Sequence, residues 1–275
     1  MSQNEQRRAP LANEMPMLGL GTWQNDDPEQ CVESVRTALE AGYRHIDTAQ
    51  AYGNEEAVGR GIAEADVDRE DVFLATKVWI ENLAHDDVIS TTEESLEKLG
   101  VDAVDLLYVH WPAGEYDAEE TLSALQQLKD DGLTDRIGVS NFEPRHLDEA
   151  RDILGEDPFA NQVELHPLLP QEELREYAEG RDLELVAYSP LARGEVFDQP
   201  EIQAVADKHG VSEAQVSLAW VREKGVTAIP KATSEAHIAD NFESLDVDLD
   251  DEDVEKIDGI DAREREVDPG FAPWN

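Results

Sequence analysis

Short apolar and β-branched runs alternate along this chain with longer stretches in which apolar residues recur every three to four positions. The short runs are typical of buried strands, and the longer period is typical of amphipathic helices. The first four strand and helix pairs are predicted at 17–23 with 28–41, 43–48 with 55–64, 72–78 with 86–99, and 104–111 with 118–131. Four more follow at 136–141 with 144–154, 160–165 with 171–179, 183–189 with 200–224, and 226–230 with 234–245.

Eight consecutive strand–helix units favour an α/β fold, a single-domain (β/α)8 TIM barrel over residues 1–275, rather than an open doubly wound sheet. No linker or change of composition interrupts the series. Polar or aromatic residues stand at the carboxyl end of every predicted strand, which is the face on which barrel enzymes build their active sites. They are Thr22 and Trp23, Asp47, Lys77, His110, Ser140 and Asn141, Gln162, Tyr188 and Ser189, and Lys231.

Four of the residues at this face suggest proton transfer. Asp47, Lys77 and His110 close three successive strands, and Tyr52 follows in the turn after Asp47. A lysine inside a barrel needs a charged partner, for which Asp47 is the nearby candidate. An ammonium beside a phenol is expected to lower its pKa, so Tyr52 would exchange a proton near neutral pH while His110 orients a carbonyl oxygen. Each residue alone is more often structural, and the combination favours catalysis.

The charge of the chain changes the expected surroundings of this site. Asp and Glu number 64 against 22 Lys and Arg, which gives a net charge of -42, whereas apolar residues make up 40% of the chain. A folded core under an acidic, lysine-poor surface indicates a halophilic protein, with an acidic mesophile protein as the alternative. Such a surface disfavours nucleic acid and anionic lipid as partners.

The cysteine count and the lack of long apolar segments lead us to expect a cytoplasmic protein. Cys31 is the only cysteine, so no internal disulfide is expected, and residues 1–10 lack the apolar segment of a signal peptide. No apolar run approaches the ~20 residues that span a bilayer. No Cys/His cluster has the spacing of metal ligands, so no metal site is expected. We expect a monomer.

Eight motifs, in order along nearly the whole chain, resemble those of the aldo-keto reductase superfamily. They are GLGTW at 19–23, HIDTAQAYGNE at 45–55, TKVW at 76–79, HWP at 110–112, GVSNF at 138–142, NQVELHP at 161–167, AYSPLARG at 187–194 and AIPKA at 228–232. The resemblance implies a (β/α)8 barrel that binds NADPH or NADH without a Rossmann unit. It also implies reversible hydride transfer to an aldehyde or ketone.

The resemblance implies a role for each site residue. Tyr52 would be the general acid for reduction, tuned by Lys77 and Asp47, and His110 would position the carbonyl. Cofactor-binding positions would be Thr22, Ser140, Asn141, Gln162, Tyr188, Ser189, Leu191, Arg193, Lys231, Thr233, Ser234, His237 and Asn241. Trp23, Trp79 and Trp111, which could equally be core residues, would surround the substrate.

The chain departs from the family pattern at the adenosine end of the cofactor. Members that prefer NADPH usually have Lys-Ser after the last strand and an Arg six residues beyond the Lys, where this chain has Lys231, Ala232 and His237. Loss of the hydroxyl and the guanidinium would remove charge-assisted hydrogen bonds to the 2′-phosphate. The preference for NADPH is therefore expected to be weakened, so that NADPH is the expected cofactor and NADH is a usable one.

Two other functions stay open at this stage. A Schiff-base aldolase would use Lys77 or Lys231 as its nucleophile, and a non-catalytic NADP(H)-sensing subunit would bind cofactor without turnover. The connection after His110 is short and the tail after Pro269 ends at Asn275. We therefore expect an open pocket that accepts various small carbonyl substrates.

Overall fold

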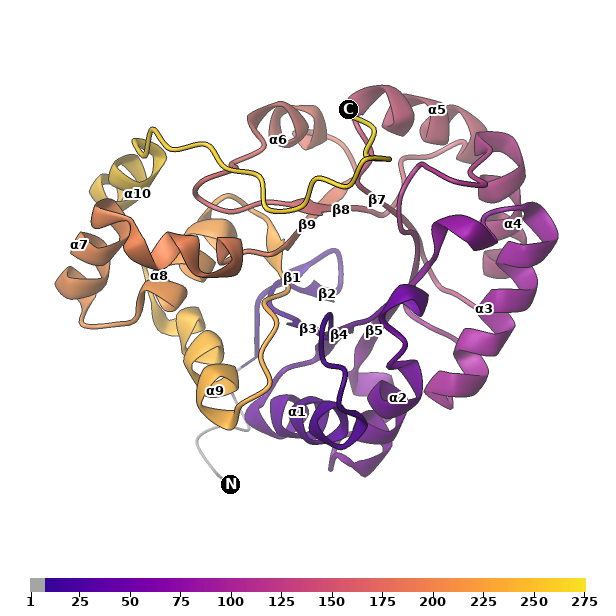
Figure 1. Cartoon of the computed structure of the whole chain (residues 1–275), viewed down its shortest axis with the longest axis horizontal. Helices are drawn as coiled ribbons and strands as arrows, with labels where there is room; N and C mark the ends of the chain where they lie inside the picture. The colour runs from indigo at the N-terminus through magenta and orange to yellow at the C-terminus, as the bar shows by residue number, and fades with distance from the viewer. Residues whose placement is uncertain (1–7) are drawn as a thin grey trace.

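A barrel of eight parallel strands forms the centre of the structure, a computed structural model that describes residues 8–275 (Figure 1). The strands are, in sheet order, β3 Leu20–Gly21, β4 His45–Asp47, β5 Phe73–Val78, β6 Leu106–Val109, β7 Ile137–Ser140, β8 Ala160–Glu164, β9 Glu184–Tyr188 and β10 Thr227–Ala228. Parallel bridges from Leu18 to Ala228 and from Gly21 to Lys231 join the first strand to the last. The predicted (β/α)8 barrel is thereby confirmed.

Closure of the barrel depends on a glycine. The Gly21 amide donates to the Pro230 carbonyl at 3.1 Å, and a Cβ at Gly21 would lie 2.7 Å from the Ile229 carbonyl oxygen. A larger residue would push β3 away from the chain segment that follows β10.

Helices surround the barrel, and most of their bounds agree with the predicted ones to within two residues (Figure 1). They are α1 Pro28–Ala41, α2 Glu55–Glu64, α3 His85–Leu99, α4 Ala118–Asp130, α5 Pro144–Leu154, α6 Glu172–Ala178, α7 Pro200–His209, α8 Glu213–Glu223, α9 Glu235–Glu243 and α10 Asp251–Asp258. Side-chain caps explain several of the starts: Asp27, Asp117 and Ser234 each accept a hydrogen bond from the backbone of the first turn.

The alternation of side chains along each strand separates two regions of the core. Residues that face the helices join the larger apolar cluster, as Leu74 and Val78 of β5 do. Residues of the other parity fill the barrel interior, where Phe73 and Ala75 meet Leu106, Tyr108 and Val186. The next inward positions toward the carboxyl ends are those of the predicted site, so the packed interior forms its floor.

A hairpin at the amino-terminal end of the barrel was not predicted from the sequence. Strands β1 Leu11–Ala12 and β2 Met15–Pro16 pair antiparallel, and the Met15 side chain is fully buried in the barrel interior. The turn uses Asn13 and Glu14 with positive φ angles of 44° and 73°, without the glycine that marks most such turns in a sequence.

Candidate active site

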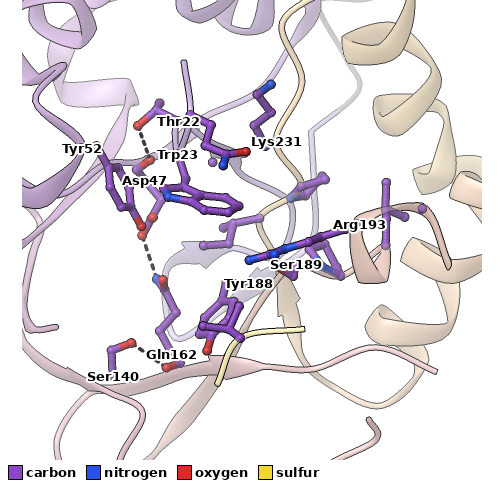
Figure 2. A pocket seen from close by; sticks show the side chains of 18 of the residues that line it. Thr22, Trp23, Asp47, Tyr52, Ser140, Gln162, Tyr188, Ser189, Arg193 and Lys231 are labelled. Atoms are coloured by element: carbon purple, nitrogen blue, oxygen red, sulfur yellow. Dashed lines mark hydrogen bonds between the residues drawn. The ribbon is translucent and has the colours of Figure 1, made fainter. Parts of the chain in front are cut away.

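A cavity of about 1000 Å³ opens at the carboxyl ends of the barrel strands. Figure 2 shows side chains from several strands pointing into it. The predicted site residues that line it are Thr22, Trp23, Asp47, Tyr52, Trp79, His110, Trp111, Ser140, Asn141, Gln162, Tyr188, Ser189, Leu191, Arg193, Lys231, His237 and Asn241. Lys77 lies behind this wall, fully buried and in contact with Asp47 and Tyr52, whereas Thr233 and Ser234 do not line the cavity.

The Lys77 ammonium is held by three oxygen atoms. It donates to Asp47 Oδ1, to the Thr48 carbonyl at 2.8 Å, and to the Tyr52 hydroxyl at 3.4 Å. Asp47 Oδ2 in turn accepts from Gln162 Nε2 at 2.8 Å (Figure 2). Burial lowers the pKa of Lys77, and the neighbouring Asp47 carboxylate opposes that shift. The paired charges therefore form a rigid base beneath the Tyr52 hydroxyl.

The protonation of Tyr52 differs from the sequence expectation. Burial raises the pKa of the Tyr52 phenol well above its usual value, and the Asp47 carboxylate raises it further. The expectation of a lowered pKa was wrong because it left out the burial of the phenol, which is the larger effect, and because the Asp47 carboxylate opposes the Lys77 ammonium. Tyr52 is a neutral phenol at neutral pH and carries the proton that a general acid needs.

His110 faces Tyr52 across the same end of the cavity. Its ring centroid is 5.7 Å from that of Tyr52 and 5.1 Å from that of Trp79, edge to face in both cases. Burial, followed by repulsion from Lys77, holds the pKa of His110 well below its usual value. The imidazole is therefore neutral. Its Nδ1 atom is buried without a hydrogen-bond partner among the residues that the structure describes.

Three strand ends beside this centre carry an amide-rich group. Asn141 Nδ2 donates to the His110 carbonyl at 3.1 Å, and Asn141 Oδ1 accepts from the Tyr188 hydroxyl at 2.9 Å. Ser140 Oγ donates to the Gln162 carbonyl at 2.7 Å (Figure 2). Asn141 has a φ of 62°, a left-handed conformation that asparagine tolerates better than most residues. These bonds fix a tyrosine ring and two carboxamides in the wall of the cavity.

The segment after β9 forms the next part of the cavity wall. Ser189, Ala192 and Arg193 all have positive φ angles, between 43° and 50°, so the backbone turns sharply. The Arg193 guanidinium lies 4.9 Å from the centroid of the Trp23 ring, which comes from the loop after β3 (Figure 2). Such contacts between a cation and an aromatic ring are favourable. The two loops thus approach each other over the middle of the cavity.

The far end of the cavity is polar and more exposed. Lys231 and His237 are exposed and line it together with Asn241, Asp240 and Glu213. Both Asp240 carboxylate oxygens are already engaged, since they accept from Ser212 Oγ and Gln215 Nε2 at 2.8 Å each. The sequence reasoning missed the two acidic residues, which belong to α8 and α9.

Ser234 and Ala232, near this end, make contacts within the protein. Ser234 Oγ accepts from the His237 backbone amide at 3.2 Å and caps α9. The Ala232 side chain is 4% exposed and packs in the larger apolar cluster, outside the cavity wall. Of the two departures from the family pattern, only His237 faces the cavity.

The carboxyl-terminal tail contributes residues that the sequence reasoning did not include. It crosses the carboxyl-end face of the barrel (Figure 1), and Val267, Pro269 and Phe271 line the cavity. The Phe271 ring stands edge to face with Trp111 at 5.5 Å and with Trp79 at 6.3 Å between centroids. The short tail therefore forms part of the pocket wall. The aromatic residues in the last five positions were the available signal.

The structure also bears on metal ions and membranes. Within residues 8–275, no group of three or more His, Cys, Asp or Glu side chains is arranged to hold a metal ion. No helix in the same range is long and apolar enough to cross a membrane.

The residues along the cavity fit a nicotinamide dinucleotide. The tyrosine ring with its two amides suits a nicotinamide, the strained turn with Arg193 suits a pyrophosphate, and Lys231 suits the phosphate of an adenosine. Lys77 is bonded on three sides and is not open to the cavity, which disfavours Lys77 as the nucleophile of a Schiff-base aldolase. A barrel with this cavity and a buried Lys–Asp pair below a tyrosine defines a dinucleotide-dependent oxidoreductase.

The chain belongs to the aldo/keto reductase family, whose model matches residues 17–262. It is 43% identical over 252 residues to a glyoxal reductase of Bacillus subtilis, covering 92% of this chain and 91% of that one. It is 41% identical over 266 residues to a methylglyoxal reductase of Escherichia coli O157:H7, covering 95% and 99%. A crystal structure of a Bombyx mori aldo-keto reductase in complex with NADP superposes with a TM-score of 0.89 at 34% identity, covering 95% and 96%.

Proposed function

We propose that this reductase acts on small aldehydes and ketones, with 1,2-dicarbonyl compounds such as glyoxal and methylglyoxal among its substrates. The observation that carries the proposal is the buried Lys77–Asp47 pair in contact with the Tyr52 hydroxyl, beside a cavity of about 1000 Å³. The similarity to a glyoxal reductase and a methylglyoxal reductase of bacteria supports the choice of dicarbonyl substrates.

In this proposal Tyr52 donates its proton to the carbonyl oxygen as negative charge develops there. Lys77 stabilises the phenolate that remains, because its ammonium is 3.4 Å from the Tyr52 oxygen. Asp47 keeps Lys77 in place and balances its charge. The neutral imidazole of His110 hydrogen-bonds the carbonyl oxygen and orients the substrate, which requires its ring N–H to point into the cavity.

The cofactor, when bound, supplies the hydride that reaches the carbonyl carbon. Tyr188 would stack on the nicotinamide ring, and Ser140, Asn141 and Gln162 would bond its carboxamide. The remaining predicted cofactor residues would hold the rest of the molecule, namely Thr22, Ser189, Leu191, Arg193, Lys231, Thr233, Ser234, His237 and Asn241. Trp23, Trp79 and Trp111 would surround the substrate.

We propose NADPH as the main cofactor, with NADH as a usable alternative. Lys231 supports binding of a 2′-phosphate, whereas His237 stands where an arginine would add a planar, permanently charged partner. The negative charges of Glu213 and Asp240 at the same end weaken the attraction for a phosphate.

The proposal extends to the domain organisation, the oligomeric state and the cellular setting of the protein. We propose one domain over residues 1–275, supported by the family match over 17–262. We further propose a cytoplasmic monomer, and we propose that it comes from a salt-rich cell, for which the net charge of -42 is the support. Light scattering in molar KCl would test the monomer, and a dimer mass would contradict it.

Measurement of NADPH oxidation with methylglyoxal tests the function. The wild type should turn over, and Tyr52→Phe should lower kcat by about 10² to 10⁴-fold, since it removes a general acid. Tyr116→Phe is the matched control, because its hydroxyl has no hydrogen-bond partner among the described residues and Tyr116 does not line the cavity. Full activity of Tyr52→Phe would contradict the proton-transfer role.

A further inference from the structure

A buried carboxylate above the catalytic layer has no place in the proposed mechanism. Glu164 ends β8 and has no solvent-exposed surface. It points to the same side of the strand as Gln162, two residues earlier, which bonds Asp47.

Glu164 binds the backbone of the carboxyl-terminal tail. Its Oε1 atom accepts from the Glu266 amide at 2.6 Å and its Oε2 atom accepts from the Val267 amide at 2.9 Å. His166 Nε2 lies 2.9 Å from Oε1, within hydrogen-bond distance of the same carboxylate. Hydrogen bonds to an ionised acceptor are stronger than neutral ones, and more so where water is excluded. A single side chain thus holds two consecutive tail residues.

The clamped segment leads directly into the aromatic wall of the pocket. Val267 and Pro269 line the cavity, and four residues beyond the clamp the Phe271 ring meets both Trp79 and Trp111. Phe271 is 41% exposed although it borders the cavity, so a bound substrate can bury more of it. Aromatic rings in edge-to-face contact offer further edges and faces to another ring.

Other contacts hold the tail less firmly. The Glu264 amide donates to the Leu168 carbonyl at 3.0 Å, upstream of the clamp. Arg145 donates to the Pro273 carbonyl at 3.2 Å, but the Arg145 side chain is 67% exposed and competes with water. Between these two points, the only charged side chain that is wholly buried and bonds the tail backbone, among the described residues, is Glu164.

We propose that Glu164 is a positioning residue that sets substrate specificity through Phe271. It holds the tail so that Phe271, Trp79 and Trp111 form a site for an aromatic substituent on the carbonyl substrate. The preferred substrates are then aryl-substituted aldehydes and ketones. This inference rests on the proposed carbonyl reduction at Tyr52, since the aromatic wall adjoins His110.

Hydrogen exchange of the tail amides tests the clamp without any substrate. In Glu164→Gln one tail amide faces an NH₂ group instead of an oxygen, so residues 264–271 should exchange about tenfold faster than in the wild type. Glu264→Gln is the matched control, because it removes the same charge from an exposed side chain of the tail that takes no part in the clamp. The tail amides of this variant should exchange at the wild-type rate. Equal exchange rates in Glu164→Gln and the wild type would overturn the clamp.

Kinetics with two diones test the specificity. Butane-2,3-dione and 1-phenylpropane-1,2-dione differ by one methyl to phenyl replacement, and the wild type should show the lower KM for the phenyl compound. Phe271→Ala should raise the KM of the phenyl compound about tenfold and that of the methyl compound much less. Glu164→Gln should shift the ratio of the two KM values in the same direction, and Glu264→Gln should leave it unchanged.

The double variant separates positioning from a general loss of structure. If Glu164 acts through Phe271, adding Glu164→Gln to Phe271→Ala should change the KM ratio by less than about twofold. A full, additive change would overturn the proposed route, and so would an unchanged ratio in Phe271→Ala, whose exposed ring can be removed without disturbing the core. If the wild type reduced neither dione with NADPH, the proposed function would fail and the specificity proposal with it, while hydrogen exchange would still decide the clamp.

Discussion

The two ends of the cavity are built in opposite ways. At the end proposed to bind the carbonyl, Lys77 and Asp47 are buried, and each is bonded to several neighbours. At the end proposed to bind the adenosine, Lys231 and His237 are exposed, and the cavity wall there also carries the acidic side chains of Glu213 and Asp240. The first end is preorganised for one reaction, because its charges cannot relax into water. Residues at the second end can be substituted with little effect on the fold.

This difference determines what a substitution should cost. Removing one member of a buried pair leaves an uncompensated charge, which destabilises a protein strongly. Removing or adding a charge at an exposed position mainly changes ligand affinity, because water screens it in the free protein. Substitutions at the buried end should therefore lower both stability and kcat. Substitutions at the exposed end should mainly change the KM for the cofactor.

Lys77→Met should show the largest effect. It leaves the Asp47 carboxylate buried without its partner, so the free energy of unfolding should fall by about 3 to 5 kcal/mol. It should also lower kcat by about a thousandfold, since the phenolate of Tyr52 loses its stabilising charge. Thermal unfolding and NADPH oxidation measure the two effects.

Two further variants sharpen this result. Lys98→Met removes an exposed lysine from α3 and should leave stability and kcat close to the wild-type values. The double variant Asp47→Asn with Lys77→Met should regain much of the stability without regaining activity. If the double variant were as unstable as Lys77→Met, the uncompensated charge would not be the cause of the instability.

At the adenosine end, His237→Arg should raise the preference for NADPH over NADH by about tenfold or more. An added guanidinium can make charge-assisted hydrogen bonds to the 2′-phosphate, worth about 1.5 to 3 kcal/mol. Thermal stability should hardly change, because His237 is exposed. Comparison of kcat/KM for the two cofactors measures the effect, and an unchanged ratio would place the 2′-phosphate away from residue 237.

Ala232→Ser tests the other departure from the family pattern and is compared with His237→Arg. The Ala232 side chain is buried in the apolar cluster, so a serine hydroxyl there should gain little contact with the cofactor. We expect a smaller change in preference than for His237→Arg. A larger one would show that the segment after β10 moves when the cofactor binds.

Salt should act on the whole surface rather than on one end. The chain has a net charge of -42, which repels an anionic cofactor, and the Debye length falls from ~10 Å at 0.1 M salt to ~3 Å at 1 M. The KM for NADPH should fall by at least about threefold between dilute buffer and molar KCl. A flat or rising KM would contradict both this explanation and the proposed adaptation to salt.

The smallest change is expected from pH. Because the pKa of Tyr52 is raised, its phenol stays protonated throughout the neutral range, and the rate of carbonyl reduction should not decline between pH 6 and about 9. The unfolded chain would ionise this tyrosine near pH 10, so the contribution of Tyr52 to stability is lost only above that pH. If kcat/KM instead fell near pH 7, and the group that titrates there were Tyr52, the pKa of Tyr52 would be lowered, which contradicts this prediction.

Much of the fold could be read from local patterns. The helices Pro28–Ala41 and Pro144–Leu154 were predicted with their observed bounds, because a proline at the start and a glycine beyond the end mark both of them. The hairpin at Leu11–Pro16 was not predicted, because strands of two residues are too short to show an alternation of apolar and polar side chains. Its stability comes from burial of Met15 inside a barrel that the rest of the chain builds.

The site was predicted unevenly for the same reason. Asp47, Lys77 and His110 each follow a recognisable strand, and parallel strands bring their carboxyl ends to one face. Phe271 lies in the irregular tail, where no sequence period predicts the position of a side chain. Its place beside Trp111 depends on the path of this tail, which Glu164 holds. Likewise, the pKa shift of Tyr52 depends on how many charges are buried next to it.

The order of strands and helices, the residues at the strand ends and the family motifs were all determined by the linear sequence, since periodicity and neighbouring residues are local properties. The tertiary structure alone decided the enclosure of the pocket, the protonation of Tyr52 and the separation of Ala232 from the cavity. Each of these depends on burial and on distances between residues far apart in the chain, and water exclusion at a given atom cannot be read from its neighbours in sequence.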